Sequence, residues 1–460
     1  MKRTLTVCVT AQNDVIVPLK SNDKVYIEMS TSFDILSKLR DFGLCNIVED
    51  ILLLLRISDL LSSQLVCKSW HTYIEEGSHW RRRLKHILCD NADLMKFLKS
   101  EVGEEYQYDP QLSFSKIHTL NRSWRTAEPK EIKIFVKSFV LSILCSEDQK
   151  SLVIGLNDGE IQIRELSYSS GFKIIKNISC HTKGVKTLAR WMKRYVVTGS
   201  YDGNIKIWNE KDWTLVKAIR LNSDSVWDCR TCDPYLAACS LDGTIFLFQY
   251  DEKYVEDSCF HLLRTIVDPG RQISSLDLNY STLLEGRDDG VILVRTIDGK
   301  ELRALRGHTQ GVTGIRFLPQ SEGSLAVSGS YDSYLRIWNV NHGYCLAVLV
   351  GHRDFIRSLA VNESRLVSGD FGGFVRVWDM SYIFKEINEY LSGILMKIRS
   401  GSNVEGRAPV EILAHRSFYP HRGHVTSLIL EPTLLITGSR ERSVACLDFW
   451  NIKKEKTYYS

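Results

Sequence analysis

One short phrase recurs along the C-terminal two-thirds of the chain and constrains its fold more than any other feature. The phrase is an apolar strand, a Gly, a turn carrying Asp, and a strand in which apolar and polar residues alternate, as in VVTGSYDGNIKIW ending at Trp208. Two clear copies end at Trp338 and Trp378, and weaker copies follow Leu152, Leu236, Leu283 and Leu435. Alternation with a period of two predicts strands with one buried face. The chain therefore holds seven strand–turn–strand repeats.

The spacing of the repeats indicates how they assemble. Their turn positions are Asp158, Asp202, Asp242, Asp289, Asp332, Gly372 and Glu441. The first five intervals between these turns are similar, close to the roughly 40 to 45 residues of one four-stranded propeller blade, and the last is longer. Residues 129–460 are therefore predicted to form an all-β, seven-bladed propeller, with an insertion at about 381–409 before the last blade.

The repeats resemble those of the WD family, in which His, Ser or Thr, Asp and Trp form a hydrogen-bond network within each blade. The resemblance implies structural roles for His181, Asp202, Trp208, His308, Asp332, Trp338, His352 and Trp378, and for His424 in blade seven. A buried polar group without a partner costs about 1–3 kcal/mol, so such residues must satisfy one another. Blades three and four lack the His, and we expect them and blade seven to be the least stable.

Two segments of the propeller leave alternatives open. A closed ring needs a fourth strand for the last blade, which the alternating residues 131–136 or the tail 456–459 can supply. The insertion begins with a helix-like stretch through Ile398 and becomes rich in Gly and Ser from Ser400. We interpret it as a surface loop, with a functional arm as the alternative.

The periodicity changes to about 3.6 between Leu39 and Leu84, which predicts short helices. This region resembles the F-box in Ile51-Leu52, Asp59-Leu60, the run LVCKSW ending at Trp70, and HWR at 79–81. The resemblance implies docking on a Skp-type adaptor through Leu44, Ile47, Ile51, Leu52, Leu60, Val66, Cys67, Trp70 and Trp80. One departure is that Arg40 follows Leu39, where the family has Pro. The alternative is a helical cap that packs only on the propeller.

These observations divide the chain into an N-terminal segment (1–32), an F-box (33–84), a helical linker (85–128) and the propeller (129–460), a multidomain α plus all-β protein. The resemblance also implies a dimerising segment ahead of the F-box, for which the residues before Phe33 are too few. We therefore expect no self-dimer.

Composition excludes several classes of function. The net charge is only +4, which argues against nucleic-acid or membrane binding. No apolar run approaches the roughly 18 residues that a spanning helix needs. Twelve scattered cysteines are typical of free thiols in the cytosol or nucleus. No HExxH, P-loop or nucleophile-elbow motif is present, so no enzyme activity, metal or cofactor is predicted.

The propeller mouth is the predicted substrate site. The chain resembles the β-transducin-repeat-containing (Slimb-like) group in its F-box motif residues, in Arg407 to Pro409 and in the terminal residues 456–459. In that group, basic residues at the mouth bind a doubly phosphorylated segment. By this resemblance Arg357 matches a phosphate-binding Arg and Gly311 a backbone contact, whereas Asn157, Gln310 and Ser427 replace Arg. Further candidates at the same loops are Phe371, Lys186, Trp227, Tyr331, Arg353 and Arg440.

The resemblances together imply a non-catalytic substrate-recognition subunit of an SCF (Skp-cullin-F-box) ubiquitin ligase, reaching cullin and RING subunits through the adaptor. Its substrate would be a protein marked for degradation. The alternative is a WD-repeat scaffold that assembles a protein complex without ligase activity.

Overall fold

The computed structural model describes residues 91–102, 110–147, 149–166, 172–221, 225–253, 259–268, 270–399 and 408–450, with short pieces at 8–9, 15–18, 24–27, 82, 84–85 and 88. Two compact units divide the chain, one of residues 1–89 and 102–115, the other of 90–101 and 116–460. The first unit contains a small sheet of β1 (Cys8–Val9), β2 (Val15–Pro18) and β3 (Lys24–Ile27). The adaptor-binding residues predicted in the F-box all lie outside the described residues.

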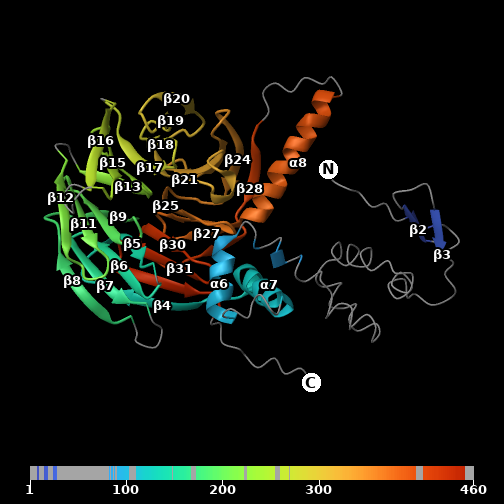
Figure 1. The fold of residues 1–460 in the computed structure, drawn as a ribbon, viewed down its shortest axis with the longest axis horizontal. Helices are drawn as coiled ribbons and strands as arrows, with labels where there is room; N and C mark the ends of the chain where they lie inside the picture. The colour runs from blue at the N-terminus through green and yellow to red at the C-terminus, as the bar shows by residue number, and fades with distance from the viewer. Residues whose placement is uncertain are drawn as a thin grey trace. The chain divides into compact units, whose positions relative to one another are not determined.

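The second unit is a seven-bladed β-propeller, as the repeats predicted (Figure 1). Blade one contains β5 (Val140–Cys145), β6 (Ser151–Leu156), β7 (Glu160–Glu165) and β8 (Ile174–Ser179). Blade two contains β9 (Val185–Trp191), β10 (Tyr195–Ser200), β11 (Asn204–Asn209) and β12 (Leu215–Arg220). Blade three contains β13 (Val226–Cys232), β14 (Tyr235–Ser240), β15 (Thr244–Tyr250) and β16 (Phe260–Val267). Blade four contains β17 (Ile273–Leu278), β18 (Thr282–Arg287), β19 (Ile292–Thr296) and β20 (Glu301–Leu305).

The last three blades differ in strand order from the first four. A strand is added to blade five, and strands from elsewhere in the chain complete blades six and seven. Blade five contains β21 (Val312–Phe317), β22 (Leu325–Ser330), β23 (Leu335–Asn339), β24 (Tyr344–Val350) and an added β28 (Val410–Leu413). A 3-10 turn (Pro319–Ser321) connects β21 to β22. Blade six contains β25 (Ile356–Val361), β26 (Arg365–Asp370), β27 (Val375–Asp379) and β29 (Arg416–Phe418). Blade seven contains β30 (Val425–Leu430), β31 (Leu434–Ser439), β32 (Ser443–Asp448) and β4 (Lys130–Phe135).

The ring closes through β4, which comes from ahead of blade one. Its residues pair antiparallel with β32, from Phe135 opposite Ser443 to Lys130 opposite Asp448. Ile134 is buried in the core shared by blades seven and one. Of the two segments that the sequence offered, residues 131–136 therefore supply the closing strand, and strands from both ends of the propeller share one sheet.

The helix-like start that the sequence predicted for the insertion is confirmed, since it forms α8 (Met380–Arg399). The interpretation of this part as a surface loop is wrong, because α8 packs on blade five together with β28, which follows the insertion and pairs in parallel with β24. Ile383 and Ile387 are buried on α8 and pack in one apolar cluster with Ile412 of β28 and Leu349 of β24. Apolar residues four apart fall on one face of a helix, and this face covers the outer edge of blade five.

The helical linker forms α6 (Ala92–Val102) and α7 (Pro110–Thr126). The part of α7 in the second unit packs on blade seven through Trp124. The Trp124 indole stacks on Phe449, with 3.7 Å between the ring centroids, and its N–H donates to the Pro432 carbonyl at 2.8 Å. Arg125 forms an ion pair with Asp379 at 2.7 Å. These contacts fix residues 116–126 to blades six and seven.

The hydrogen-bond network implied by the WD resemblance is present in blade five. His308 bonds Asp332 through Nδ1 at 2.8 Å and Ser328 through Nε2 at 2.7 Å, and the Trp338 indole donates to the same Ser328 hydroxyl at 2.7 Å. Burial lowers the pKa of His308 despite the neighbouring carboxylate of Asp332. The network joins β22, β23 and the turn between them to the loop before the blade. Blade two repeats it with His181, Thr198, Asp202 and Trp208.

In blade six the network differs at two positions, because Asp370 replaces the turn Asp and the buried Trp378 Nε1 has no hydrogen-bond partner among the described residues. His352 bonds Asp370 at 2.7 Å and Ser368 at 2.6 Å. The carboxylate therefore comes from the end of β26, since Gly372 stands where other blades have the turn Asp. Trp378 is buried, and its ring centroid lies 5.8 Å from that of His352.

The assignment of His424 to the network of blade seven is wrong. His421 takes that role: it is buried and bonds Thr437 Oγ1 at 2.7 Å and Glu441 Oε1 at 2.8 Å. His424 instead packs its ring on Phe371, with centroids 4.1 Å apart. Like His181, His308 and His352, His421 lies four residues before the first strand of its blade, whereas His424 lies directly before β30.

In blade four, buried ionised side chains take the place of the His, Ser or Thr, Asp and Trp network. Glu285 is fully buried and accepts from Arg287 Nε at 2.5 Å and Arg295 Nε at 2.9 Å, while both arginines also contact Asp268. In the repeat, Glu285 stands at the Ser or Thr position and Arg295 at the Trp position. We call Asp268, Glu285, Arg287 and Arg295 the blade-four ion cluster.

Candidate functional site

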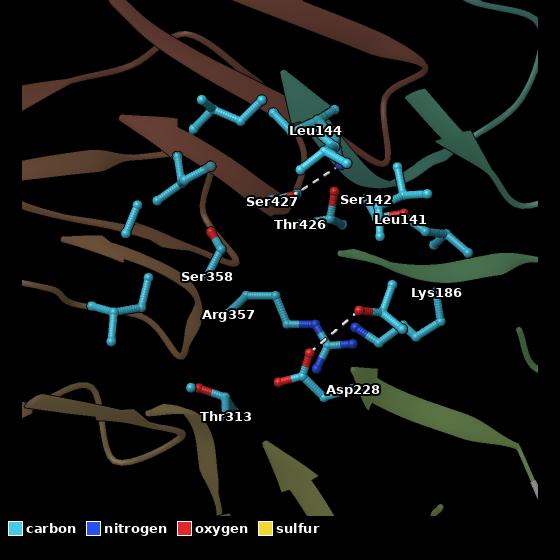
Figure 2. Close-up of a pocket in the computed structure, with 18 of the residues that line it drawn as sticks. Leu141, Ser142, Leu144, Lys186, Asp228, Thr313, Arg357, Ser358, Thr426 and Ser427 are labelled. Atoms are coloured by element: carbon cyan, nitrogen blue, oxygen red, sulfur yellow. Dashed lines mark hydrogen bonds between the residues drawn. The ribbon is translucent and has the colours of Figure 1, made fainter. Parts of the chain in front are cut away.

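The first strands of the seven blades surround a central cavity of about 310 Å³. It is lined by residues of β5, β9, β13, β17, β21, β25 and β30. Because the first strand of each blade lies nearest the ring centre, consecutive residues of β5, β25 and β30 line this cavity. Figure 2 shows polar side chains from several blades converging there, including Lys186, Asp228, Thr313 and Arg357.

A belt of hydroxyl groups holds neighbouring first strands together around the cavity. Ser142 donates to the Val185 carbonyl at 3.0 Å, Thr313 to Ile356 at 2.7 Å, and Ser358 to Val425 at 2.9 Å. Each bond joins one blade to the next and satisfies a carbonyl near the ring centre. The cavity wall is therefore a rigid support for the side chains that it presents.

Two basic side chains meet at one aromatic ring in this wall. Lys186 Nζ lies 5.2 Å and Arg357 Cζ 5.6 Å from the centroid of the Trp227 ring, both within cation–π range. Lys186 extends from β9 and Arg357 from β25 toward the same part of the cavity (Figure 2). Desolvation, with the charge of Arg357, lowers the pKa of Lys186 to about 7.

Asp228 is a carboxylate in the same cavity wall, and its oxygens are engaged by other donors. It accepts from the backbone N–H of Cys229 at 3.0 Å and of Leu276 at 3.2 Å, and from Arg230 Nε at 3.3 Å. Among the described residues, neither Lys186 nor Arg357 forms an ion pair with a carboxylate. Arg357 therefore presents positive charge to the cavity, and Lys186 adds to it when protonated, a form that the charge of Asp228 favours.

An aromatic cluster adjoins the basic pair on the side of blades five to seven. It consists of Tyr331, Phe355, Phe371 and His424, whose neighbouring ring centroids are 4.1 to 6.1 Å apart. Arg357 donates to the Tyr331 hydroxyl at 3.2 Å, which connects the cluster to the basic pair. Phe355 is 42% exposed, a large fraction for an aromatic ring held among others. We call these four residues the aromatic cluster.

The structure brings some of the predicted mouth residues together and separates others. Lys186, Trp227, Arg357, Tyr331 and Phe371 form one continuous group. Gly311 supports this group, since its carbonyl accepts the Tyr331 N–H at 2.9 Å and a Cβ there would lie 3.3 Å from the Tyr331 ring.

The two remaining arginines are exposed. Arg440 follows β31, and its backbone N–H donates to the His424 carbonyl at 3.2 Å, so it borders the aromatic cluster. Arg353 lies in the loop before β25 and is not among the residues that line the cavity.

Sequence reasoning missed several residues of the site. Phe355 lies in the same segment as Arg357, and alternation along the loop and strand places both near one face. Asp228 and Arg230 follow Trp227 at the start of β13 and line the cavity. Asp277 of β17 is not among the lining residues; desolvation raises its pKa to about 7, and the Phe317 N–H donates to it at 2.7 Å. Charged residues at the middle of a first strand are the signal that identifies such positions.

Metal and thiol chemistry have little support in the part of the chain that the structure describes. No group of three or more His, Cys, Asp or Glu residues gathers there in a way that could hold a metal ion. Burial raises the thiol pKa of both Cys229 and Cys232, the two cysteines of the CxxC spacing. No described helix is long and apolar enough to cross a membrane.

Comparison with known families defines the class of protein. The model described as "WD domain, G-beta repeat" matches residues 172–209, 299–339 and 343–379, which lie in blades one and two and four to six. The model described as "F-box-like" matches residues 45–86. An F-box-like segment followed by WD repeats is the composition of F-box/WD-repeat proteins, and this chain has that composition.

Individual relatives are similar over parts of the chain. Nuclear distribution protein PAC1 of Arthroderma otae is 28% identical over 198 residues, 40% of this chain and 33% of that protein. Mitochondrial division protein 1 of Neurospora crassa is 24% identical over 34% of this chain and 24% of its own length. Cell division control protein 4 of Saccharomyces cerevisiae is 22% identical over 345 residues, 72% of this chain and 40% of that protein. The chain thus spans well under two thirds of the curated relatives that it matches.

Proposed function

We propose that this protein is the substrate-recognition subunit of an SCF-type ubiquitin ligase, with the F-box bound to a Skp-type adaptor and the propeller bound to substrate. The observation that carries the proposal is the F-box-like match at residues 45–86 ahead of a WD-repeat propeller. The adaptor connects the chain to cullin and RING subunits. The protein acts in the cytosol or nucleus and performs no bond chemistry itself.

The propeller contributes by holding a substrate at a fixed place. Residues 116–126 of α7 are fixed to blades six and seven through Trp124 and Arg125. They contact the blade end that carries the loop between β30 and β31, whereas the aromatic cluster lies on loops at the other end, because successive loops of an antiparallel sheet alternate between its two ends. A substrate bound at the cluster therefore does not meet residues 116–126. Tethering raises the effective concentration of substrate lysines near the ubiquitin-conjugating enzyme.

Adaptor capture tests the F-box half of the proposal. We expect the wild-type chain to co-purify with a Skp-type adaptor, and Leu52→Glu or Trp70→Ala to reduce capture at least about tenfold, because hot-spot residues of an interface contribute about 2 kcal/mol or more. Arg357→Glu, which changes the propeller alone, should retain full capture. If the wild-type chain fails to bind any Skp-type adaptor, the ligase function is wrong and a scaffold without ligase activity takes its place.

Substrate capture tests the mouth of the propeller. We expect Arg357→Glu to remove most of the proteins that the wild-type chain enriches from cells with proteasomes inhibited, as measured by quantitative mass spectrometry. The substitution reverses the charge beside Trp227 and removes the bond to Tyr331. The matched control is Arg306→Glu, which makes the same change at an exposed residue outside the cavity lining. Equal enrichment by both variants would place the substrate site elsewhere.

A further inference from the structure

We propose that Lys186 is a covalent modification site whose side-chain amine reacts with dissolved carbon dioxide to form a carbamate. The Nζ nitrogen forms a bond to the carbon of carbon dioxide, the electron pair of one C=O π bond moves to its oxygen, and the nitrogen releases one proton to water. No oxidant, reductant or catalyst takes part. The inference concerns the chemistry of one side chain and does not depend on the proposed function.

The Lys186 amine lies where a small molecule can reach it. Lys186 lines the central cavity (Figure 2), a space of about 310 Å³, and its Nζ lies 5.2 Å from the centroid of the Trp227 ring. No described carboxylate forms an ion pair with it. The oxygens of the neighbouring Asp228 accept instead from two backbone N–H groups and from Arg230 Nε. Among the described residues, no salt bridge therefore holds this amine in the ammonium form.

Arg357 is positioned to bind the product of this reaction. Its Cζ lies 5.6 Å from the centroid of the same Trp227 ring, and its Nη1 donates to the Tyr331 hydroxyl at 3.2 Å, which fixes the guanidinium in the cavity wall. A carbamate carries its negative charge on two oxygens, and guanidinium groups bind carboxylate-like oxygens with charge-assisted hydrogen bonds. Acetylation or imine formation at Lys186 would give Arg357 no anion to bind. The charge of the site therefore favours a carbamate over these modifications.

The surroundings of Lys186 also keep part of its amine unprotonated at neutral pH. Desolvation, followed by the charge of Arg357 on β25, lowers the pKa of Lys186 to about 7; Arg230 of β13 adds to this effect, whereas Asp228 of β13 and the buried thiol of Cys239 on β14 oppose it. Only an unprotonated amine attacks carbon dioxide. About half of Lys186 has that form at pH 7, against fewer than about one in a thousand for an ordinary lysine.

The place of Lys186 in the ring limits which reagents can modify it. The first strands of all seven blades surround the cavity, so the active site of an acyltransferase would have to enter a space of about 310 Å³ to reach the amine. Carbon dioxide is small and reacts with amines without an enzyme. The product replaces a cation with an anion beside Arg357, so the charge of the cavity wall follows the concentration of carbon dioxide.

The experiment incubates the full chain with isotope-labelled bicarbonate at neutral pH and then adds a trialkyloxonium salt, which converts a carbamate into a stable ester. Proteolysis and mass spectrometry measure the label at each lysine. We expect Lys186 to carry at least about tenfold more label than Lys183, an exposed lysine of the preceding loop, because far more of its amine is unprotonated. At about pH 10, where exposed lysines also lose their proton, this ratio should fall.

Variants test the part that Arg357 plays. Arg357→Met should reduce the label at Lys186 at least about tenfold, because the carbamate loses its charge-assisted bond and because more of the amine is protonated. The matched control is Arg306→Met, which makes the same change at an exposed arginine outside the cavity lining and should leave the label at Lys186 unchanged. Thermal melts of each variant verify that it is folded.

Two results would overturn the inference: label at Lys186 no higher than at Lys183, or equal label at Lys186 in the Arg357→Met and Arg306→Met variants. Adaptor capture is a separate measurement on the same chain, so the failure of one does not decide the other. A chain that binds the adaptor but carries no carbamate at Lys186 would keep the proposed function and lose this inference.

Discussion

Replacing Glu285 with Leu is expected to lower the free energy of unfolding by about 3–5 kcal/mol, the usual cost of removing one partner from a buried ion pair. Glu285 is fully buried in blade four and accepts a hydrogen bond from each of two arginines. Burial disfavours the charge of Arg287, yet the bond and the charge of Glu285, with Asp268, raise its pKa. Without Glu285, both guanidinium groups keep the ion pair with Asp268, which is partly exposed, and Arg295 also keeps its bond to the Gly299 carbonyl.

Chemical denaturation followed by circular dichroism measures this loss. A second variant, Glu285→Leu with Arg287→Leu and Arg295→Met, separates the ion cluster from simple packing. Because replacing a whole buried ion cluster with apolar residues is often neutral or stabilising, this variant should recover most of the stability. A loss below about 1 kcal/mol for Glu285→Leu alone would mean that solvent reaches the cluster and screens it.

Replacing Trp124 with Ala is expected to release the linker helix from the propeller. Trp124 is 2% exposed, stacks on Phe449, lies 4.5 Å from the Arg365 guanidinium carbon and bonds Pro432. Truncating a buried Trp to Ala typically costs about 3–5 kcal/mol. Because these contacts join 116–126 to blade seven, the loss should be local, with hydrogen exchange increasing in this segment and little change in blades two and three.

The same substitution should leave substrate capture unchanged. Trp124 contacts the end of the blades opposite the loops of the aromatic cluster, so Trp124→Ala should still enrich the proteins that the wild-type chain enriches. Trp124→Phe is the matched control: it keeps the stacking and loses the bond to Pro432, worth about 1 kcal/mol. Unchanged hydrogen exchange in Trp124→Ala would show that Arg125 and the neighbouring contacts suffice to hold the helix.

Local sequence pattern predicted most of the propeller and part of its mouth. Asp202 and Trp208 lie in one repeat and are joined through His181 and Thr198 of the same blade, so spacing alone finds them. Trp227 belongs to blade three and Arg357 to blade six, and they meet only because the ring brings their first strands to one cavity. Both residues can be found in the sequence as mouth candidates, because they occupy corresponding loop positions in their repeats. This comparison does not distinguish Arg357 from Arg353, which is exposed.

Two features that the sequence pattern did not predict have different causes. His421 could have been identified from its spacing, because it lies four residues before the first strand of its blade, as His181, His308 and His352 do. Residues 410–413 lack an obvious repeat partner in the sequence, yet they pair with β24, although three strands of blade six and α8 intervene along the chain. That pairing does not depend on local preference, because its partner is remote along the chain.

The amino-acid sequence by itself determined the number of blades, the strands within each and the hydrogen-bond networks of blades two and five, since alternation, turn residues and a regular repeat length act over short distances. Only the tertiary structure decided that β4 closes the ring, that α8 and β28 cover blade five, and that Lys186 and Arg357 share one indole. The reason is that a closed ring places residues from distant repeats side by side around its centre, and no local pattern records which of them will meet.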